Sequence, residues 1–149
     1  MKLYRSAHAV YKNQYHLVWV ARFRRKILVP GVDRYLEIKL REARQYYPDW
    51  YFTAIGIDRD HVHLHMEIPP KYSVSFVVET LKKNTSRALR AKFPFLDKVY
   101  WDRGGIWAKG FFSSTVGVNE AVIRRYVEMQ GEEETGQAQL EFPTEIPRL

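Results

Sequence analysis

The stretch from residue 61 to residue 70 reads His61-Val-His-Leu-His-Met-Glu-Ile-Pro-Pro70. Side chains alternate between the two faces of a β-strand, so the three histidines and Glu67 share one face and the apolar residues share the other. The two prolines end the strand, because proline has no amide hydrogen for a neighbouring strand. We expect the apolar face to pack against helices and the histidines to lie on the opposite sheet face.

Alternation, helical spacing and capping residues predict the elements on either side of this strand. The expected strands are residues 15–22, 50–57, 61–68 and 107–116. The expected helices are residues 33–47, the segment from a Ser73 cap to Pro94, and the segment from an Asn119 cap to Gln130. This order predicts an α+β fold, namely a ferredoxin-like (βαββαβ) sandwich with one antiparallel sheet, two helices on one face and an added C-terminal helix. The other sheet face would be free for chemistry.

Composition limits the function further. The chain has 149 residues, of which 46% are hydrophobic, and it has no cysteine. We expect one domain over residues 1–131 with an acidic tail over 132–149, and neither disulfides nor thiolate chemistry. Residues 1–130 carry 23 basic and 12 acidic side chains, a net charge of +11. A field of that sign attracts polyanions. No leader or membrane-spanning run is evident, which predicts a cytoplasmic protein.

The histidine spacing predicts a metal or catalytic site. Imidazoles at positions i and i+2 of a strand lie about 7 Å apart and can converge on one ion. We therefore assign His63 and His65 as candidate ligands, with His61 at the strand entrance as a weaker candidate. The alternative is that they are polar residues of an exposed strand face. The pattern also resembles that of histidine-triad nucleotide hydrolases, although Glu67 stands where that motif has an apolar residue.

The last expected helix brings together a phenol and a carboxamide, since Tyr126 and Gln130 are four residues apart. A tyrosine can attack phosphorus and store the energy of the broken phosphodiester as a phosphotyrosine ester. The amide oxygen of Gln130 could complete a metal site. The alternative is that Tyr126 is a core residue, because it continues an apolar stripe on the helix.

Basic residues gather on segments that could follow a DNA backbone. The predicted DNA-binding residues are Arg22, Arg24, Arg25, Lys82, Lys83, Arg87, Arg124 and Arg125. Those on the second helix are expected to face away from its apolar stripe. Nearby aromatic side chains that could stack on unpaired bases are Trp19, Phe23, Trp101 and Trp107.

Three features in order resemble one family: the histidine strand with its two prolines, the segment Trp107-Ala-Lys-Gly-Phe-Phe112, and Tyr126-Val-Glu-Met-Gln130. Together with the opening Tyr15-His-Leu-Val-Trp-Val-Ala-Arg22, they resemble the HUH single-tyrosine transposases, which include TnpA and the REP-associated tyrosine transposases. The likeness spans roughly residues 8–131. Phe111 departs from it, because the family often has tyrosine there.

The resemblance implies that His63 and His65 bind Mg²⁺ or Mn²⁺ with Gln130, that His61 lies beside this site, and that Tyr126 is the nucleophile. It implies cleavage of single-stranded DNA at the foot of a hairpin, leaving a 5′-phosphotyrosine and a free 3′-hydroxyl, with no nucleotide cofactor. It also implies a homodimer in which the tyrosine helix, hinged at Gly117, completes the partner's site. When bound to DNA, such a protein would be associated with the nucleoid. The competing functions are a nucleotide hydrolase and a non-catalytic ferredoxin-like nucleic-acid-binding module.

Overall fold

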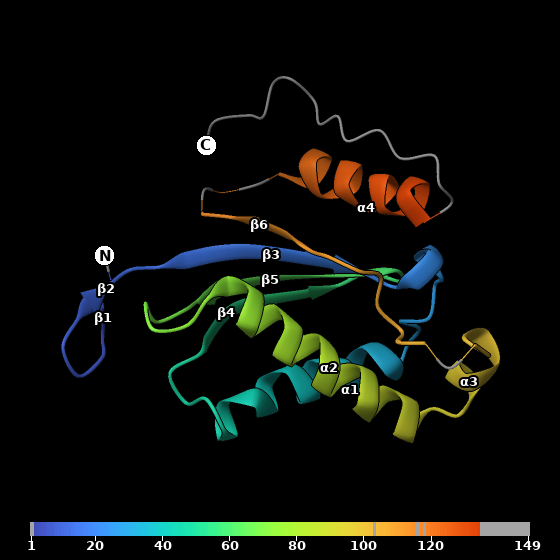
Figure 1. Cartoon of the computed structure of the whole chain (residues 1–149), viewed down its shortest axis with the longest axis horizontal. Helices are drawn as coiled ribbons and strands as arrows, with labels where there is room; N and C mark the ends of the chain where they lie inside the picture. Colours follow the sequence, from blue (N-terminus) through green and yellow to red (C-terminus); the bar gives the residue numbers. More distant parts are fainter. Residues whose placement is uncertain (1, 103, 116, 118, 135–149) are drawn as a thin grey trace.

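The computed structural model describes residues 2–102, 104–115, 117 and 119–134, and it has the predicted α+β architecture (Figure 1). Its strands are β1 (Tyr4–Arg5), β2 (Val10–Tyr11), β3 (Gln14–Val20), β4 (Tyr51–Ile57), β5 (His61–Glu67) and β6 (Phe112–Ser114). Its helices are α1 (Val32–Glu42), α2 (Val74–Lys92), α3 (Phe95–Val99) and α4 (Glu120–Glu134), with short 3₁₀ turns η1 (Arg22–Arg24) and η2 (Ala43–Gln45).

The main sheet has the strand order β4-β5-β3-β6, and every neighbouring pair is antiparallel. Because β3 and β4 both run against β5, they are parallel to each other and α1 connects them. In the same way, α2 connects β5 to β6. These two split crossovers are consistent with the predicted ferredoxin-like arrangement. The central strands β3 and β5 are paired with Val18 opposite His63 and His16 opposite His65.

The core lies between the sheet and helices α1 and α2, as the apolar face of β5 predicts. Val62, Leu64 and Met66 are at most 2% exposed, and Leu36 of α1 and Leu81 of α2 belong to the same buried cluster. Burial of one such side chain stabilises the fold by about 1.5–3 kcal/mol. This packing fixes the strand register, because a slip of one residue would turn the histidines into the core.

The second sheet face is not open over its whole width, and here the sequence-based prediction is wrong. Helix α4 lies on this face, above β3 and β6 in Figure 1. Val18 and Val20 of β3 are apolar on this side too, and they form a second buried cluster with Tyr126, Val127 and Met129 of α4. Over β5 the face stays accessible, and the side chains of His61, His63 and His65 are half-exposed.

The last strand is much shorter than the expected residues 107–116, of which Val116 lies outside the described residues. Strand β6 contains three residues, and Trp107 makes one isolated bridge to Ala21. Gly110, between Trp107 and β6, has a φ of +82°. The Nζ of Lys82 donates to the carbonyls of Ala108 and Gly110, at 2.8 and 3.0 Å. A buried cation therefore takes up two carbonyls that a regular strand would pair.

Two helix starts were predicted correctly. The amide of Phe76 donates to Ser73 Oγ at 3.0 Å, and the amide of Val122 donates to Asn119 Oδ1 at the same distance. The predicted end of α4 at Gln130 was wrong, because the helix continues through Gly131 to Glu134. A glycine inside a helix costs only about 1 kcal/mol relative to alanine, and the glutamates that follow are good helix formers. The rest of the predicted acidic tail, residues 135–149, lies outside the described residues.

Three short elements were not predicted: the hairpin of β1 and β2, the turn η1, and the five-residue helix α3. In η1, Phe23 and Arg24 have φ values of 60° and 52°, which are rare for residues other than glycine. No helix in the described part of the chain is long and apolar enough to cross a membrane.

Candidate active site

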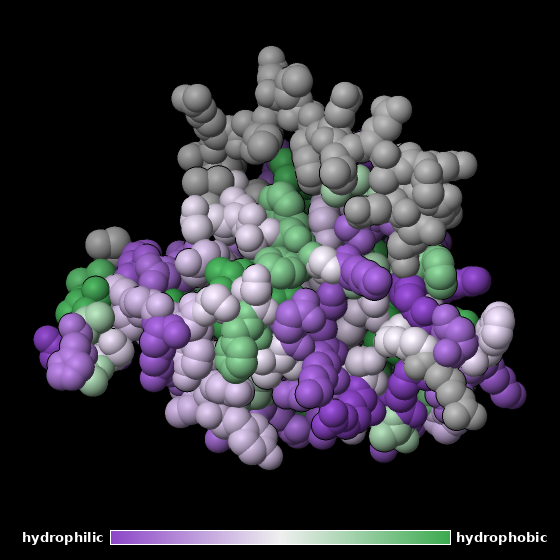
Figure 2. All heavy atoms as spheres, in the orientation of Figure 1, coloured by the Kyte–Doolittle hydropathy of each residue, from purple (hydrophilic) through white to green (hydrophobic). Residues whose placement is uncertain are grey.

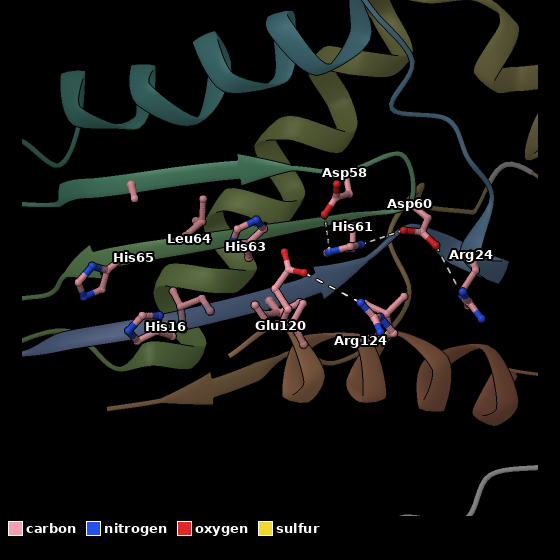
Figure 3. Close-up of a pocket in the computed structure, with 15 residues that line it drawn as sticks. His16, Arg24, Asp58, Asp60, His61, His63, Leu64, His65, Glu120 and Arg124 are labelled. Carbon is pink, nitrogen blue, oxygen red and sulfur yellow. Dashed lines mark hydrogen bonds and ion pairs between the residues drawn. The ribbon is translucent and has the colours of Figure 1, made fainter. Parts of the chain in front are cut away.

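The histidines of β5 line a cavity of about 450 Å³ between the sheet and the first two turns of α4 (Figure 3). Cross-strand pairing adds His16 from β3, and the loop before β5 adds Asp58 and Asp60. The residues that α4 contributes are Glu120, Ile123, Arg124 and Val127. The cavity therefore combines imidazoles, carboxylates and the two guanidinium groups of Arg24 and Arg124.

His61 is held between two carboxylates. Its Nδ1 lies 2.8 Å from Asp60 Oδ1, and its Nε2 lies 3.0 Å from Asp58 Oδ2. The hydrogen bond from His61 lowers the pKa of Asp60, and Arg24, with Nε at 3.6 Å from Asp60 Oδ2, acts in the same direction. Asp60 is mostly buried, whereas the side chain of Asp58 is 64% exposed. Asp60 thus orients the ring, and the contact at Nε2 is the more exposed of the two.

His63 is the central histidine of the cavity. Its ring centroid lies 6.1 Å from that of His61, and its ring lies against Gly56 of β4, where a Cβ would overlap it. Burial lowers the pKa of His63 and the nearby His61 lowers it further, while Asp58 and Glu120 partly oppose this. A neutral imidazole is the form that binds a metal ion.

His65 is directed to a different neighbour. Its ring stacks on that of His16, with centroids 4.4 Å apart and planes 14° apart. All three histidines of β5 therefore line one cavity, but ring proximity pairs His63 with His61 and His65 with His16. Among the described residues, no three His, Asp or Glu side chains are arranged so that they could hold a metal ion. A metal site built on these histidines would take a further ligand, of another kind or from another chain.

Acid should destabilise this cavity, which gives a first prediction. Burial, with the nearby His65 and His63, lowers the pKa of His16, and the pKa of His63 is lowered too. Above about pH 6.5 both are neutral in the folded and unfolded chain, so they contribute no pH dependence. Below it the unfolded chain binds protons first, so the free energy of unfolding should fall. Urea unfolding at pH 7.5 and 5.5 measures this, and His16→Gln should reduce the difference. Equal stability of the wild type at both values would contradict the assignment.

Tyr126 and Gln130 lie together, as their spacing predicts, but not at the histidines. They line a second cavity of about 860 Å³, whose other walls include Arg22, Phe23 and Trp107. Tyr126 is 4% exposed, Gln130 is 6% exposed, and the Tyr126 ring lies 5.8 Å from that of Phe112. One face of α4 thus meets the histidines and a different face carries Tyr126 and Gln130. Within one chain the predicted site residues form two groups in two cavities.

The predicted DNA-binding residues differ in how far they are available. Exposed side chains are those of Arg24, Arg25, Lys83, Arg87 and Arg124, and that of Arg125 is half-exposed. Lys82 does not face away from the apolar stripe, as we expected, but is 8% exposed and bonded to two carbonyls. Helix periodicity could not show this, because the acceptors belong to a distant irregular segment. Gly117, the predicted hinge, precedes the Asn119 cap and is half-exposed.

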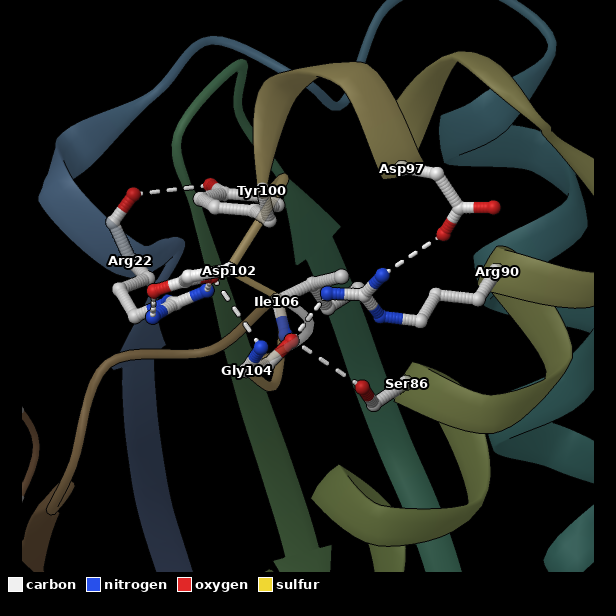
Figure 4. Close-up of polar contacts among 8 residues, drawn as sticks. All are labelled: Arg22, Ser86, Arg90, Asp97, Tyr100, Asp102, Gly104 and Ile106. Atoms are coloured by element: carbon white, nitrogen blue, oxygen red, sulfur yellow. Dashed lines mark hydrogen bonds and ion pairs between the residues drawn. The ribbon is translucent and has the colours of Figure 1, made fainter.

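Arg22 forms a clamp on the segment before β6 (Figure 4). Both terminal nitrogens donate to the carboxylate of Asp102 at 2.7 Å, and this bond lowers the pKa of Asp102 to about 2. The guanidinium also lies 4.9 Å from the centre of the Tyr100 ring. Arg90 holds the same segment from α2 by donating to Asp97 and to the carbonyl of Gly104. These arginines shape the wall of the Tyr126 cavity, a role that charge counting did not reveal.

Comparison with known proteins gives a consistent result. A family model described as "Transposase IS200 like" matches residues 9–130. The transposase for insertion sequence element IS200 from Salmonella typhimurium is 33% identical, with 92% of this chain and 89% of that protein aligned. The ISDra2 transposase TnpA of Deinococcus radiodurans is 30% identical, over 84% of this chain and 89% of the relative.

Two solved structures share the fold. A crystal structure of a Deinococcus radiodurans protein assigned as a transposase superposes with a TM-score of 0.71 at 25% identity, covering 93% of this chain and 98% of the other. A REP-associated tyrosine transposase bound to a REP hairpin gives a TM-score of 0.53 at 18% identity, covering 93% of this chain and 76% of the other. At that identity the second match supports the fold alone.

Proposed function

The chain belongs to the IS200-like transposase family, and from this premise we propose that it cleaves and rejoins single-stranded DNA at hairpin-marked ends of a mobile element. The observation that carries the proposal is the histidine cavity, which lies directly beneath the helix that bears Tyr126 and Gln130. Family membership gives no support to a nucleotide hydrolase or to a non-catalytic binding module.

In this proposal the Tyr126 phenolate attacks the phosphorus of one phosphodiester. The phosphorus–3′-oxygen bond breaks, the 3′-oxygen takes up a proton, and the 5′-phosphate remains on the tyrosine. The reverse attack by another 3′-hydroxyl frees the tyrosine and joins the strands, with no nucleotide cofactor. The guanidinium groups of Arg124 and Arg125, which belong to the same helix, would offset phosphate charge.

A divalent cation, Mg²⁺ or Mn²⁺, fits the donor set of the histidine cavity. Burial favours the neutral form of His63, and Asp60 holds His61 by Nδ1, an arrangement typical of metal-binding histidines. The Nε2 of His61 would bind the cation after the exposed carboxylate of Asp58, which lies 3.0 Å away, moves aside. We therefore favour His61 as the partner of His63, while His65, the ligand expected from the sequence, is stacked on His16. The amide of Gln130 would supply the ligand of another kind. When bound, the cation would offset the charge that develops on the phosphate.

The separation of the two groups favours assembly of the site from two chains. Tyr126 and Gln130 line a different cavity from the histidines of their own chain. We therefore propose a homodimer in which α4, moving about Gly117, brings these two side chains to the histidines of the partner. Residues 120–127 would then exchange one set of apolar contacts with β3 for an equivalent set in the partner.

The proposal predicts a metal-dependent covalent adduct. Single-stranded oligonucleotides that carry the ends of the chain's own element should yield a protein-linked fragment bearing the 5′-phosphate, in Mn²⁺ and also in Mg²⁺. Denaturing gel electrophoresis with label on the 3′ fragment detects it. Chelation with EDTA should abolish the adduct, and added Mn²⁺ should restore it. Undiminished cleavage in EDTA would remove the metal from the mechanism.

A further inference from the structure

The hairpin formed by β1 and β2 projects from one end of the main sheet, beyond the start of β3 (Figure 1). Its two strands pair Tyr4 with Tyr11 and Arg5 with Val10. The family model begins at residue 9, so β1 lies outside the matched region. None of the site residues discussed above belongs to this hairpin.

The hairpin is firmly attached, although it contains only two short strands. Tyr11 is 6% exposed, and the Tyr4 ring lies 6.0 Å from the Tyr11 ring and 5.0 Å from the Tyr51 ring. Glu67, which is fully buried at the end of β5, accepts a hydrogen bond from the Asn13 amide at 2.9 Å. Three aromatic rings and a buried carboxylate thus hold the base of the hairpin on the sheet.

The outward surface of the hairpin is basic. Residues 2–13 contain Lys2, Arg5 and Lys12 and no acidic residue. All three basic side chains are exposed, and none of the ion pairs found among the described residues involves them. Leu3 and Val10 are 54% and 56% exposed, and Figure 2 shows hydrophilic and hydrophobic side chains side by side on this projecting end. A cationic two-stranded ribbon has the size that enters the major groove of a duplex.

The hairpin is also at a useful distance from the candidate active site. His61 and Glu67 are the two ends of β5, which at about 3.3 Å per residue lie about 20 Å apart. That length corresponds to about six base pairs of duplex. A stem that starts at the hairpin and runs along β5 would thus need about six base pairs to reach the histidine cavity.

We propose that the β1–β2 hairpin is a duplex-binding arm that grips the stem of the DNA hairpin, with Lys2, Arg5 and Lys12 contacting its phosphates. This inference rests on the proposed function for the identity of the DNA, but it concerns binding and not cleavage. It assigns the recognition of double-stranded DNA to a part of the chain far from the tyrosine and the histidines.

The test compares two triple variants of the full chain. Lys2→Gln/Arg5→Gln/Lys12→Gln removes three charges from the hairpin, and Arg34→Gln/Arg41→Gln/Lys98→Gln removes three exposed charges from helices α1 and α3. Affinity for an oligonucleotide stem-loop is measured by fluorescence anisotropy in EDTA at several salt concentrations. Three lost phosphate contacts should reduce the slope of log affinity against log salt by about 2 to 3 in the hairpin variant, and leave it unchanged in the control.

Equal slopes in the two triple variants would overturn the proposal. So would an equal loss of affinity for an unstructured single strand, or a changed oligomeric state of the hairpin variant in sedimentation. The single variant Lys12→Gln should lower the slope by about 1 and guards against a folding defect. Cleavage of the stem-loop oligonucleotide with its flanking single strand is measured separately in Mn²⁺. Absence of this cleavage in the wild type would refute the proposed function, while the binding result would still decide the role of the hairpin.

Discussion

Tyr126→Phe is expected to abolish the covalent protein–DNA adduct, lowering strand cleavage by about 10³-fold or more. The substitution removes one oxygen atom and keeps the ring that packs near Phe112, so the fold should be retained. Binding of hairpin DNA should be unchanged, because the phenol acts on phosphorus and not in recognition. The measurements are adduct formation on denaturing gels and hairpin affinity by anisotropy. Full adduct formation by the phenylalanine variant would refute the assignment of the nucleophile.

Mixing inactive variants tests which chain supplies the tyrosine. Tyr126→Phe retains the histidines, and His63→Ala retains the tyrosine. If α4 acts on the partner, a mixed dimer contains one complete site, and random exchange should restore about one quarter of wild-type activity. If each chain uses its own tyrosine, no mixed dimer contains a complete site and activity stays at the level of the separate variants. The second result would contradict assembly from two chains.

The general fold could be predicted because the sequence signals are local and agree with one another. The alternation in β5 and the caps at Ser73 and Asn119 each specify one element, and the structure contains all of them. The residues whose positions were predicted wrongly are those whose partners lie far away in the chain. Helical spacing predicts that Lys82 is exposed. Its side chain instead donates to the carbonyls of Ala108 and Gly110, which are 26 and 28 residues further along the chain.

The candidate site could be predicted in part. Strand alternation places all three histidines in one cavity, and helical spacing places Tyr126 beside Gln130, both as found. The pairing of rings could not be derived from β5 alone, because it depends on His16 across the strand pair and on the Asp58–Asp60 turn. The covering of the second sheet face by α4 could have been suspected from Val18 and Val20, since β3 is apolar on both faces.

Gly56→Ala should inactivate the protein without unfolding it. A Cβ at residue 56 would overlap the imidazole of His63, so the ring has to leave its position in the cavity. Alanine is otherwise favoured over glycine within a strand by about 0.5–1 kcal/mol, so thermal stability should be kept. Changing a residue that orients a metal ligand typically costs about 10–100-fold in metal affinity. Titration with Mn²⁺ and adduct formation at saturating Mn²⁺ measure the two consequences.

The control for Gly56→Ala is the histidine itself. If the methyl group acts only through the His63 ring, then Gly56→Ala has no further effect on Mn²⁺ affinity in a His63→Ala background. Additive losses would mean that Gly56 acts on the cavity by another route, for example through the pairing of β4 with β5. The three atoms nearest to a Cβ at residue 56 all belong to His63, whereas His65 is stacked on His16. The same experiment therefore distinguishes His63 from His65 as the metal ligand. Retention of full metal affinity by Gly56→Ala would exclude His63 as a ligand.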